Sequence, residues 1–242
     1  MTSWDEPAFW GEKWADIYDG DDELDPTSAV DFLAPLAGGG RALELAIGTG
    51  RVALPLAARG VRVEGIDGSP SMVERMRTKP GGDLPVVVGD MADVAVDGPF
   101  SLVFVVYNSL FNLPNGQRQA DTFAGVTRVL ESGGLFVLEC FVPDPTRCDR
   151  GQRVETLDVT ENSAVLELTR HDAAAQRSIT QKVLFTPRGI RLLPTAIRYA
   201  WPSELDLMAR LAGLELRERY ADWDRTPFGS DSRSHISVYA KP

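Results

Sequence analysis

The stretch that decides the fold is RALELAIGTGRVALPLAARG, residues 41–60. Its apolar start, residues 41–46, predicts a buried strand, and the helical pattern that follows carries Pro55 near its first turn. Between them, Gly48-x-Gly50-x-x-Ala53 matches the glycine pattern of nucleotide-binding turns. Such glycines let the backbone approach a ligand, and the helix start offers free N–H groups. A glycine-rich turn that binds nothing is the alternative at this point.

The segments on either side repeat the alternation of strand and helix. Apolar runs predict further strands at residues 61–67, 85–90, 100–108 and 134–141, and helical patterns cover residues 69–79 and 117–131. This alternation is typical of a parallel sheet covered on both faces. Two helices, near residues 8–18 and 26–37, precede it.

The pattern changes after Pro143. Residues 152–200 contain three or four alternating segments with hairpin-like spacing and no helix between them, which predicts an antiparallel β insertion after the fifth strand. A helix (203–213) and two strands (214–223 and 234–242) follow. We therefore expect an N-terminal helical lid (1–37), an α/β core (38–150 and 202–242) and an insertion that roofs the pocket (151–201).

Composition narrows the function classes. The chain has 242 residues, 43% of them apolar, and a net charge of −10, which disfavours a nucleic-acid partner. It shows no apolar stretch long enough to span a bilayer and no secretion signal, and its two cysteines favour a reducing cytoplasm. Residues 1–31 hold ten acidic residues and one lysine, so this segment is either a solvated surface or a device that steers a cationic acceptor. Oligomeric state stays open.

Three carboxylates distinguish the candidate nucleotides. Asp67 ends the second strand, where an acidic residue that binds ribose belongs. Glu44 lies inside the first strand, where a carboxylate suits an ammonium group better than a dinucleotide's pyrophosphate. Asp90 and Met91 end the third strand, where the carboxylate can accept the adenine amino group and the amide can donate to the ring. These features favour S-adenosylmethionine (SAM) over NAD.

Five segments carry a resemblance to the class I SAM-dependent methyltransferases: LELAIGTGR (43–51), GIDGSPSMV (65–73), GDM (89–91), VVYNSLFNL (105–113) and VLESGGLFVLE (129–139). The sequence departs from that family's pattern at Ala46, where glycine is usual, and at Ser132, where proline is common. Alanine is the smallest replacement, so we expect cofactor binding to survive.

The resemblance implies a Rossmann-like α/β fold, with a seven-stranded sheet whose last strand is antiparallel. It also implies S-adenosylhomocysteine as the product and assigns cofactor contacts to Tyr18, Glu44, Ala46, Gly48, Gly50, Arg51, Asp67, Gly68, Ser69, Met72, Asp90, Met91, Tyr107 and Asn108. Tyr18 resembles a tyrosine that closes over the cofactor, and Tyr107 is expected beneath the methyl group. We take both as catalytic candidates.

The acceptor side is predicted from strand ends. An antiparallel last strand begins at the edge where the parallel strands end, which places His235 near the pocket mouth as a candidate general base. The other expected substrate contacts are Trp14, Phe111, Glu139, Phe141, Tyr199 and Trp201. His171 lies in an expected hairpin turn, where we expect it to be exposed, and no residue spacing suggests a metal site.

The favoured function is methyl transfer to an amine, either the N-terminal α-amine of a peptide or a small-molecule amine, in natural-product metabolism. The chain as a whole resembles an actinobacterial group that includes N-terminal α-amino methyltransferases of peptides. O-methylation of a small metabolite, with His235 as base, is the nearest alternative. A catalytically inactive cofactor-binding protein is the alternative from another class, and a NAD-dependent oxidoreductase is a third.

Overall fold

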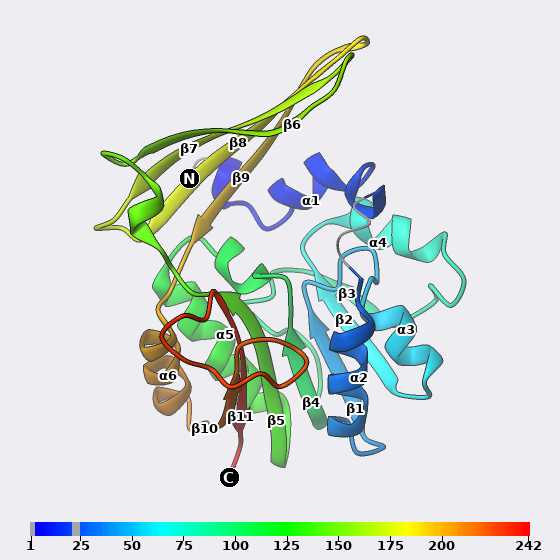
Figure 1. Ribbon diagram of the computed structural model, residues 1–242. Helices are drawn as coiled ribbons and strands as arrows, with labels where there is room; N and C mark the ends of the chain where they lie inside the picture. Colours follow the sequence, from blue (N-terminus) through cyan, green and yellow to red (C-terminus); the bar gives the residue numbers. More distant parts are fainter. Residues whose placement is uncertain (1–2, 21–24) are drawn as a thin grey trace.

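The computed structural model describes residues 3–20 and 25–242 of the chain. A seven-stranded sheet forms its centre, in the order β10-β11-β5-β4-β1-β2-β3 (Figure 1). β11 runs antiparallel to both neighbours, while β5, β4, β1, β2 and β3 pair in parallel, which confirms the predicted topology. The strands of this sheet are β1 (Arg41–Leu45), β2 (Arg62–Asp67), β3 (Val86–Val88), β4 (Phe100–Val105), β5 (Leu130–Phe141), β10 (Glu215–Tyr220) and β11 (Ser234–Ala240).

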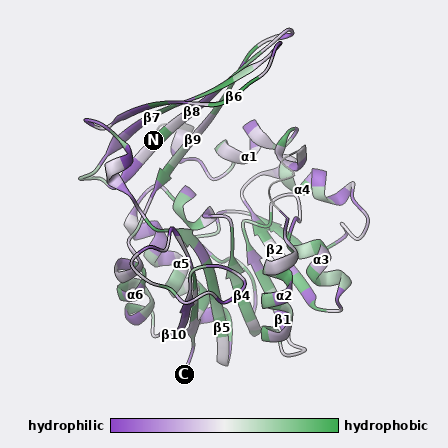
Figure 2. Ribbon diagram, viewed as in Figure 1, coloured by the Kyte–Doolittle hydropathy of each residue, from purple (hydrophilic) through white to green (hydrophobic). Residues whose placement is uncertain are grey.

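Helices cover both faces of the sheet. Buried side chains of α5 and α6, such as Phe123 and Met208, pack on one face. Those of α2 and α3, such as Leu33 and Leu56, pack on the other. The central strands are therefore apolar on both sides, as their green colour shows (Figure 2). The α-helices are α1 (Phe9–Trp14), α2 (Thr27–Leu36), α3 (Ala53–Ala58), α4 (Pro70–Arg77), α5 (Gly116–Val129) and α6 (Pro202–Leu211).

The insertion is a separate antiparallel sheet in the order β6-β7-β8-β9. It projects over the edge of the central sheet where the parallel strands end, with α1 between the two (Figure 1). Its strands are β6 (Gln152–Val159), β7 (Ala164–Asp172), β8 (Arg177–Thr186) and β9 (Gly189–Arg198). The predicted β insertion is thus confirmed as four strands.

Local expectations differ from the structure mainly in extent. The helix predicted over 8–18 is a short α1 followed by turns and a 3₁₀ turn at Tyr18–Gly20. The helix predicted over 50–60 is α3, six residues long. Residues 21–24 of the acidic loop lie outside the described residues. Among the residues the structure covers, no helix is both long and apolar enough to cross a membrane.

Candidate active site

A cavity of about 470 Å³ opens between the parallel strand ends, the N-terminal segment and the inserted sheet. Residues 3–20 form one wall, which we call the lid. The cavity has two other walls. The floor is made by the ends of the parallel strands and the turns that follow them, and the roof is made by β7, β8 and β9. The lid contributes Trp4, Asp5, Glu6, Pro7, Phe9, Trp10, Gly11, Trp14, Ile17 and Tyr18. The floor includes Glu44, Ala46, Ile47, Gly48, Arg51, Asp67, Gly68, Met72, Asp90, Met91, Tyr107 and Asn108, and the roof adds Glu167, Thr180, Lys182, Thr195, Ala196 and Ile197.

The turn after β1 forms the centre of the floor. Both Ala46 (φ 57°) and Gly48 (φ 58°) adopt left-handed backbone conformations. Glycine adopts this region freely, whereas an alanine there is strained by roughly 1–2 kcal/mol. Ala46 adopts the backbone conformation that the turn requires, at this cost in strain. Its side chain is a single methyl group, so the backbone of the turn stays close to the cavity.

Asp67, at the end of β2, braces this turn. Its carboxylate accepts the Gly48 N–H (2.7 Å) through one oxygen and the Ser69 N–H (2.8 Å) through the other. The side chain is 8% exposed, and burial raises its pKa even though both amide bonds favour the ionised form. A carboxylate has about four acceptor positions, so two accepted N–H bonds leave room for two hydroxyl donors from the cavity.

Glu44 is a buried carboxylate of the floor that accepts a hydrogen bond from the Ala53 backbone. It is 2% exposed, and its Oε2 has no hydrogen-bond partner. Burial, with a contribution from the nearby Asp67 charge, raises the pKa of the Glu44 carboxyl well above its ordinary value. A buried carboxylate oxygen that faces a cavity without a partner is suited to an incoming cation.

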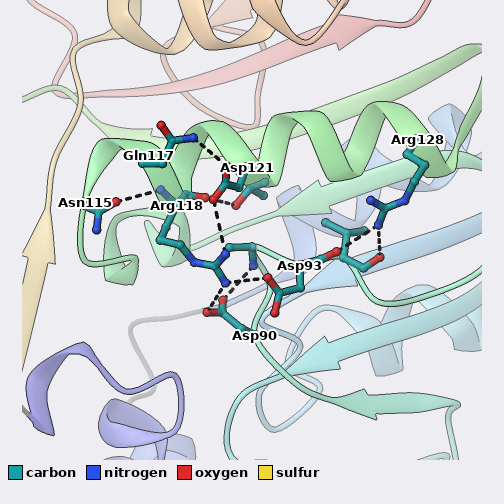
Figure 3. A network of polar contacts seen from close by, with 10 residues as sticks. Asp90, Asp93, Asn115, Gln117, Arg118, Asp121 and Arg128 are labelled. Carbon is teal, nitrogen blue, oxygen red and sulfur yellow. Dashed lines mark hydrogen bonds and ion pairs between the residues drawn. The ribbon is translucent and has the colours of Figure 1, made fainter. Parts of the chain in front are cut away.

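Asp90 follows β3 and is held by a charged network (Figure 3). One carboxylate oxygen accepts the Ala92 N–H (2.9 Å), and the other accepts Arg118 Nη2 (2.7 Å). Arg118 extends from α5 and also pairs with Asp93, and these contacts raise its pKa. Asp90 therefore reaches the cavity as an acceptor whose position is fixed by these two bonds.

The turn after β4 is strained and clamped. Tyr107 (φ 53°) and Asn108 (φ 62°) are consecutive residues with positive φ. The Glu139 carboxylate accepts the Tyr107 N–H (2.7 Å) and the Trp223 Nε1–H (3.1 Å), and Asn108 Oδ1 accepts the Phe141 N–H (2.6 Å). Such strain persists only where the surroundings fix it, and here it directs the Tyr107 ring into the cavity.

Two carboxylates fasten the lid to the core. Glu12 accepts hydrogen bonds from the hydroxyls of Ser69 and Ser71, both at 2.6 Å. Asp19 accepts from Thr49 Oγ1 (2.7 Å) and Lys79 Nζ (2.8 Å), and it also pairs with Arg75. The lid is therefore seated directly on the nucleotide turn and on the start of α4.

The same lid is tied to the roof. Asp5 pairs with Arg177 and Asp16 with Arg191, and the Trp14 indole donates to the Pro194 carbonyl (3.2 Å). Most acidic side chains of residues 3–20 are thus engaged in contacts with the rest of the molecule. This arrangement supports a fastening role for the acidic segment rather than an inert solvated surface.

Tyr18 and Arg51 close the cavity at the nucleotide turn. The Arg51 guanidinium donates to the Tyr18 carbonyl (2.7 Å) and lies 4.7 Å from the Tyr18 ring centroid. Burial raises the pKa of Tyr18 to about 12, and it raises the pKa of Tyr107 to about 12, with Glu139 adding to the effect. Both phenols stay protonated near neutral pH, so they can donate hydrogen bonds but cannot act as general bases there.

Comparison with known proteins agrees with this geometry. A family described as "Methyltransferase domain" matches residues 42–134. The solved CcbJ methyltransferase of Streptomyces caelestis is 38% identical, with a TM-score of 0.91 over 98% of this chain and 99% of that one. The chain belongs to the class I SAM-dependent methyltransferases.

The chain is also similar to a curated sequence relative and shares its fold with a more distant solved structure. The cypemycin N-terminal methyltransferase of Streptomyces sp. is 29% identical over 204 residues, which cover 81% of each chain. The SAM-bound structure of CalS10 from Micromonospora echinaspora shares the fold, with a TM-score of 0.70 at 21% identity over 95% of this chain and 96% of that one.

The floor of this methyltransferase fits SAM. The cofactor carries an ammonium, a ribose diol and an adenine, and the floor offers a partnerless Glu44 oxygen, spare acceptor positions on Asp67 and the fixed carboxylate of Asp90. These three carboxylates follow or lie in three neighbouring strands, β1, β2 and β3. In the part of the chain that the structure describes, no cluster of His, Cys, Asp and Glu is arranged to hold a metal.

The prediction that His235 lies at the pocket mouth is wrong. Strand alternation turns its side chain to the α6 face of the sheet, where it is fully buried and its Nδ1 lies 2.8 Å from Ser237 Oγ. Burial lowers the pKa of His235 to about 4, and the residue does not line the cavity. The sequence predicted the correct edge of the sheet but could not predict which face the side chain occupies.

Other predicted contacts also lie elsewhere. Phe111 is fully buried beneath Phe141, with ring centroids 5.0 Å apart, and Trp201 is 40% exposed at the start of α6. Glu139 clamps the Tyr107 backbone rather than lining the cavity, and Tyr199 lines a second cavity beside the first.

A few smaller expectations need similar revision. His171 is half-buried at the end of β7, with Nε2 2.9 Å from the Tyr199 hydroxyl, rather than exposed in a turn. Ser69 and Gly50 support the floor without lining it: Ser69 caps α4, and Gly50 packs against Met76. Trp14 and Phe141 do line the cavity.

Replacing Asp67 tests the floor directly. We expect Asp67→Ala to weaken SAM binding by roughly 1–3 kcal/mol, because the ribose loses its acceptor and the Gly48 turn loses its brace. Calorimetry of SAM binding measures this loss. Asp97→Ala, which alters a carboxylate away from the cavity, is the control, and an affinity equal in both variants would contradict the placement of the ribose.

Proposed function

We propose that the protein transfers a methyl group from SAM to an amine, and that the acceptor is a peptide N-terminal α-amine or a small-molecule amine of natural-product metabolism. The carrying observation is the charge of the cavity. Six carboxylates line it against two cationic side chains: Asp5, Glu6, Glu44, Asp67, Asp90 and Glu167 against Arg51 and Lys182. A net negative wall attracts a cationic amine and disfavours an anionic acceptor.

Aromatic side chains support the same conclusion. The lid brings Trp10 and Trp14 together with ring centroids 5.7 Å apart, and Tyr18 meets Trp10 edge-on at 5.4 Å. Aromatic faces stabilise cations by roughly 0.5–2 kcal/mol each when water is excluded. Both the sulfonium of the cofactor and an ammonium acceptor benefit from such walls.

The proposed cofactor contacts follow from the floor. Glu44 and the Ala46–Gly48 turn hold the methionine part, Asp67 and Gly68 the ribose, and Asp90 and Met91 the adenine. Met72 lies beside the adenine and ribose, while Tyr107 and Asn108 lie below the reacting carbon. Tyr18 and Arg51 close over the cofactor from the lid side. S-adenosylhomocysteine is the product that the transfer leaves behind.

When bound, SAM supplies an activated methyl carbon on a sulfonium sulfur. The protein's task is to align the acceptor nitrogen with that carbon and to exclude water, which the lid and roof accomplish together. An acceptor bound as an ammonium ion would first release one proton to solvent. The nitrogen lone pair would then form the new N–C bond as the C–S bond breaks, which leaves S-adenosylhomocysteine and the methylated amine as an ammonium ion. The two tyrosines, protonated near neutral pH, position these groups and take up no proton.

The position of His235 removes one argument for oxygen transfer. A hydroxyl acceptor generally needs a general base, and His235, the base that oxygen transfer would have used, lies outside the cavity. The names of the relatives point the same way: one is an N-terminal methyltransferase, and another an amino pentose methyltransferase.

Cys140 and Cys148 are free thiols, which suits the proposed cytoplasmic location.

A mass-spectrometric methylation assay tests the proposal. The protein and SAM are incubated with peptides whose N-termini are free or acetylated, and with matched small amines and phenols. We expect a mass increase of one methyl group on free-amine acceptors only.

Transfer to phenols alone would replace the proposal with O-methylation. SAM binding without transfer to any member of the panel would instead favour the alternative of an inactive cofactor-binding protein. Glu44→Gln is the control: methyl transfer that takes place in this cavity should be reduced in the variant.

A further inference from the structure

A second cavity of about 570 Å³ lies beside the first under the same roof. Four residues line both cavities: Phe141, Glu167, Thr180 and Ile197. Each cavity by itself is within the range of about 300–1,000 Å³ that small-molecule sites occupy. The shared lining residues place the second cavity directly beside the space proposed for the acceptor and the cofactor.

The strand register explains why one roof covers both cavities. Glu167 pairs with Lys182, Thr169 with Thr180 and His171 with Ser178 across β7 and β8. Paired residues of antiparallel strands project from the same face, so these three rows form one continuous surface. Lys182 lines only the first cavity and Ser178 lines only the second. Thr180 lies between these two residues on β8 and lines both cavities.

The two cavities differ in charge. The second is lined by three guanidinium groups and three carboxylates, from Arg147, Arg153, Arg233, Asp144, Glu167 and Asp231. These three positive and three negative charges balance. The second cavity therefore offers no net attraction for an ionic group, in contrast to the acidic first cavity.

Hydroxyl groups dominate the rest of the second lining. Thr169 and Thr180 share a hydrogen bond (3.1 Å), and the Tyr199 hydroxyl bonds His171 (2.9 Å). Each hydroxyl has one donor and two acceptor positions, so these pairs keep capacity for a ligand. Ser178, Ser230 and Ser232 add three more hydroxyls.

We propose that the second cavity is the distal half of the acceptor site and takes an uncharged, hydroxyl-bearing group of the acceptor, such as a glycosyl unit. This inference rests on the proposed function for the placement of the amine in the first cavity. A peptide extension fits less well, because an extended peptide that adds to a sheet needs a free strand edge for its main-chain bonds. The cavity instead faces side chains of β7 and β8, whose edges are both paired.

The experiment compares two amines that differ only in this group. Binding of 2-aminoethanol and of 2-aminoethyl β-glucopyranoside is measured by calorimetry on protein loaded with S-adenosylhomocysteine, so the readout needs no methyl transfer. We expect the glucoside to bind about tenfold more tightly, equivalent to about 1.4 kcal/mol. Glycyl-serinamide is the peptide probe.

Variants locate the effect. Ser178→Leu fills the second cavity alone and should abolish the advantage of the glucoside, with affinities for aminoethanol and S-adenosylhomocysteine unchanged. Thr169→Val removes a hydroxyl with little change in volume and should reduce the advantage. Thr156→Leu, on the opposite face of the inserted sheet, should leave it intact.

The results separate the two proposals. Equal affinity for the two amines, or an advantage that Ser178→Leu does not change, overturns the distal site. Tighter binding of the peptide than of the glucoside, with the same sensitivity to Ser178→Leu, overturns the hydroxyl-bearing group in favour of a peptide. Glucoside binding that behaves as expected but leads to no methyl transfer would contradict the proposed function and leave the distal site standing.

Discussion

Glu44→Gln is expected to weaken SAM binding by roughly 1.5–3 kcal/mol, about 10–150-fold. The variant replaces the hydrogen bond between the cofactor ammonium and a carboxylate by a weaker one to a neutral amide. The orphaned Oε2 of Glu44 is the observation behind this expectation. Calorimetry with SAM measures the loss. The Gln side chain keeps the shape of Glu, so the difference reports charge rather than packing.

The same variant should not be less stable without cofactor. Burial raises the pKa of Glu44 in the folded protein above its ordinary value of 4.5. A carboxyl with a raised folded pKa destabilises the fold as pH rises from that ordinary value to the raised one, because the unfolded chain releases the proton first. Glu44→Gln removes this cost, so its Tm at neutral pH should equal or exceed that of the unaltered protein. A lower Tm would show that the hydrogen bond from the Ala53 backbone to the Glu44 carboxylate stabilises the fold by more than burial of the charge destabilises it.

The pH dependence of SAM binding gives a second readout. The ionised form of Glu44 attracts the ammonium, so affinity should fall as pH drops through the raised pKa of the cofactor-free protein. Binding within that window should release a proton, which calorimetry in two buffers of different ionisation enthalpy detects. Glu44→Gln should lose both effects, and an unchanged pH slope in the variant would assign them to another group.

The parts of the site that sequence predicts are those set by local geometry. Gly48, Asp67 and Asp90 each sit in or just after a strand of the parallel sheet, where the chain direction alone places them at the binding edge. Their roles depend on little beyond the neighbouring turn. The strand order could likewise be predicted from the family resemblance and the alternation of elements.

The parts that sequence does not predict depend on which face a side chain occupies. His235 begins the right strand at the right edge, yet its side chain lies on the α6 face. Glu167 and Lys182 were not predicted, because their common face depends on the register of the β7–β8 hairpin. Glu12 and Asp19 fasten the lid through contacts to residues more than 50 positions away, Ser69 for Glu12 and Arg75 for Asp19. No rule of sequence spacing predicts contacts over such separations.

Gly11→Ala should displace the lid. Gly11 is buried in α1, and a methyl group there would lie 2.4 Å from Ser69 Cβ and 3.0 Å from Met72 Cγ. Ser69 cannot easily give way, because it caps α4 and donates to Glu12. The lid must shift outward, and the positions of Trp14 and Tyr18 shift with it.

A displacement of this kind is expected to be costly because the reaction depends on alignment. A misplacement of about 1 Å can reduce turnover by about 100-fold, so we expect kcat/KM for the acceptor that the methylation assay finds to fall roughly 10–100-fold, with weaker SAM binding. Alanine favours helix over glycine by about 1 kcal/mol, so a weakened α1 cannot explain the loss. Gly20→Ala, in the same lid with no atom within 4 Å of the added methyl, is the matched control. Equal activity in the two variants would show that the contact between Gly11 and Ser69 does not limit catalysis. A loss of activity in Gly11→Ala alone would show that catalysis depends on this contact.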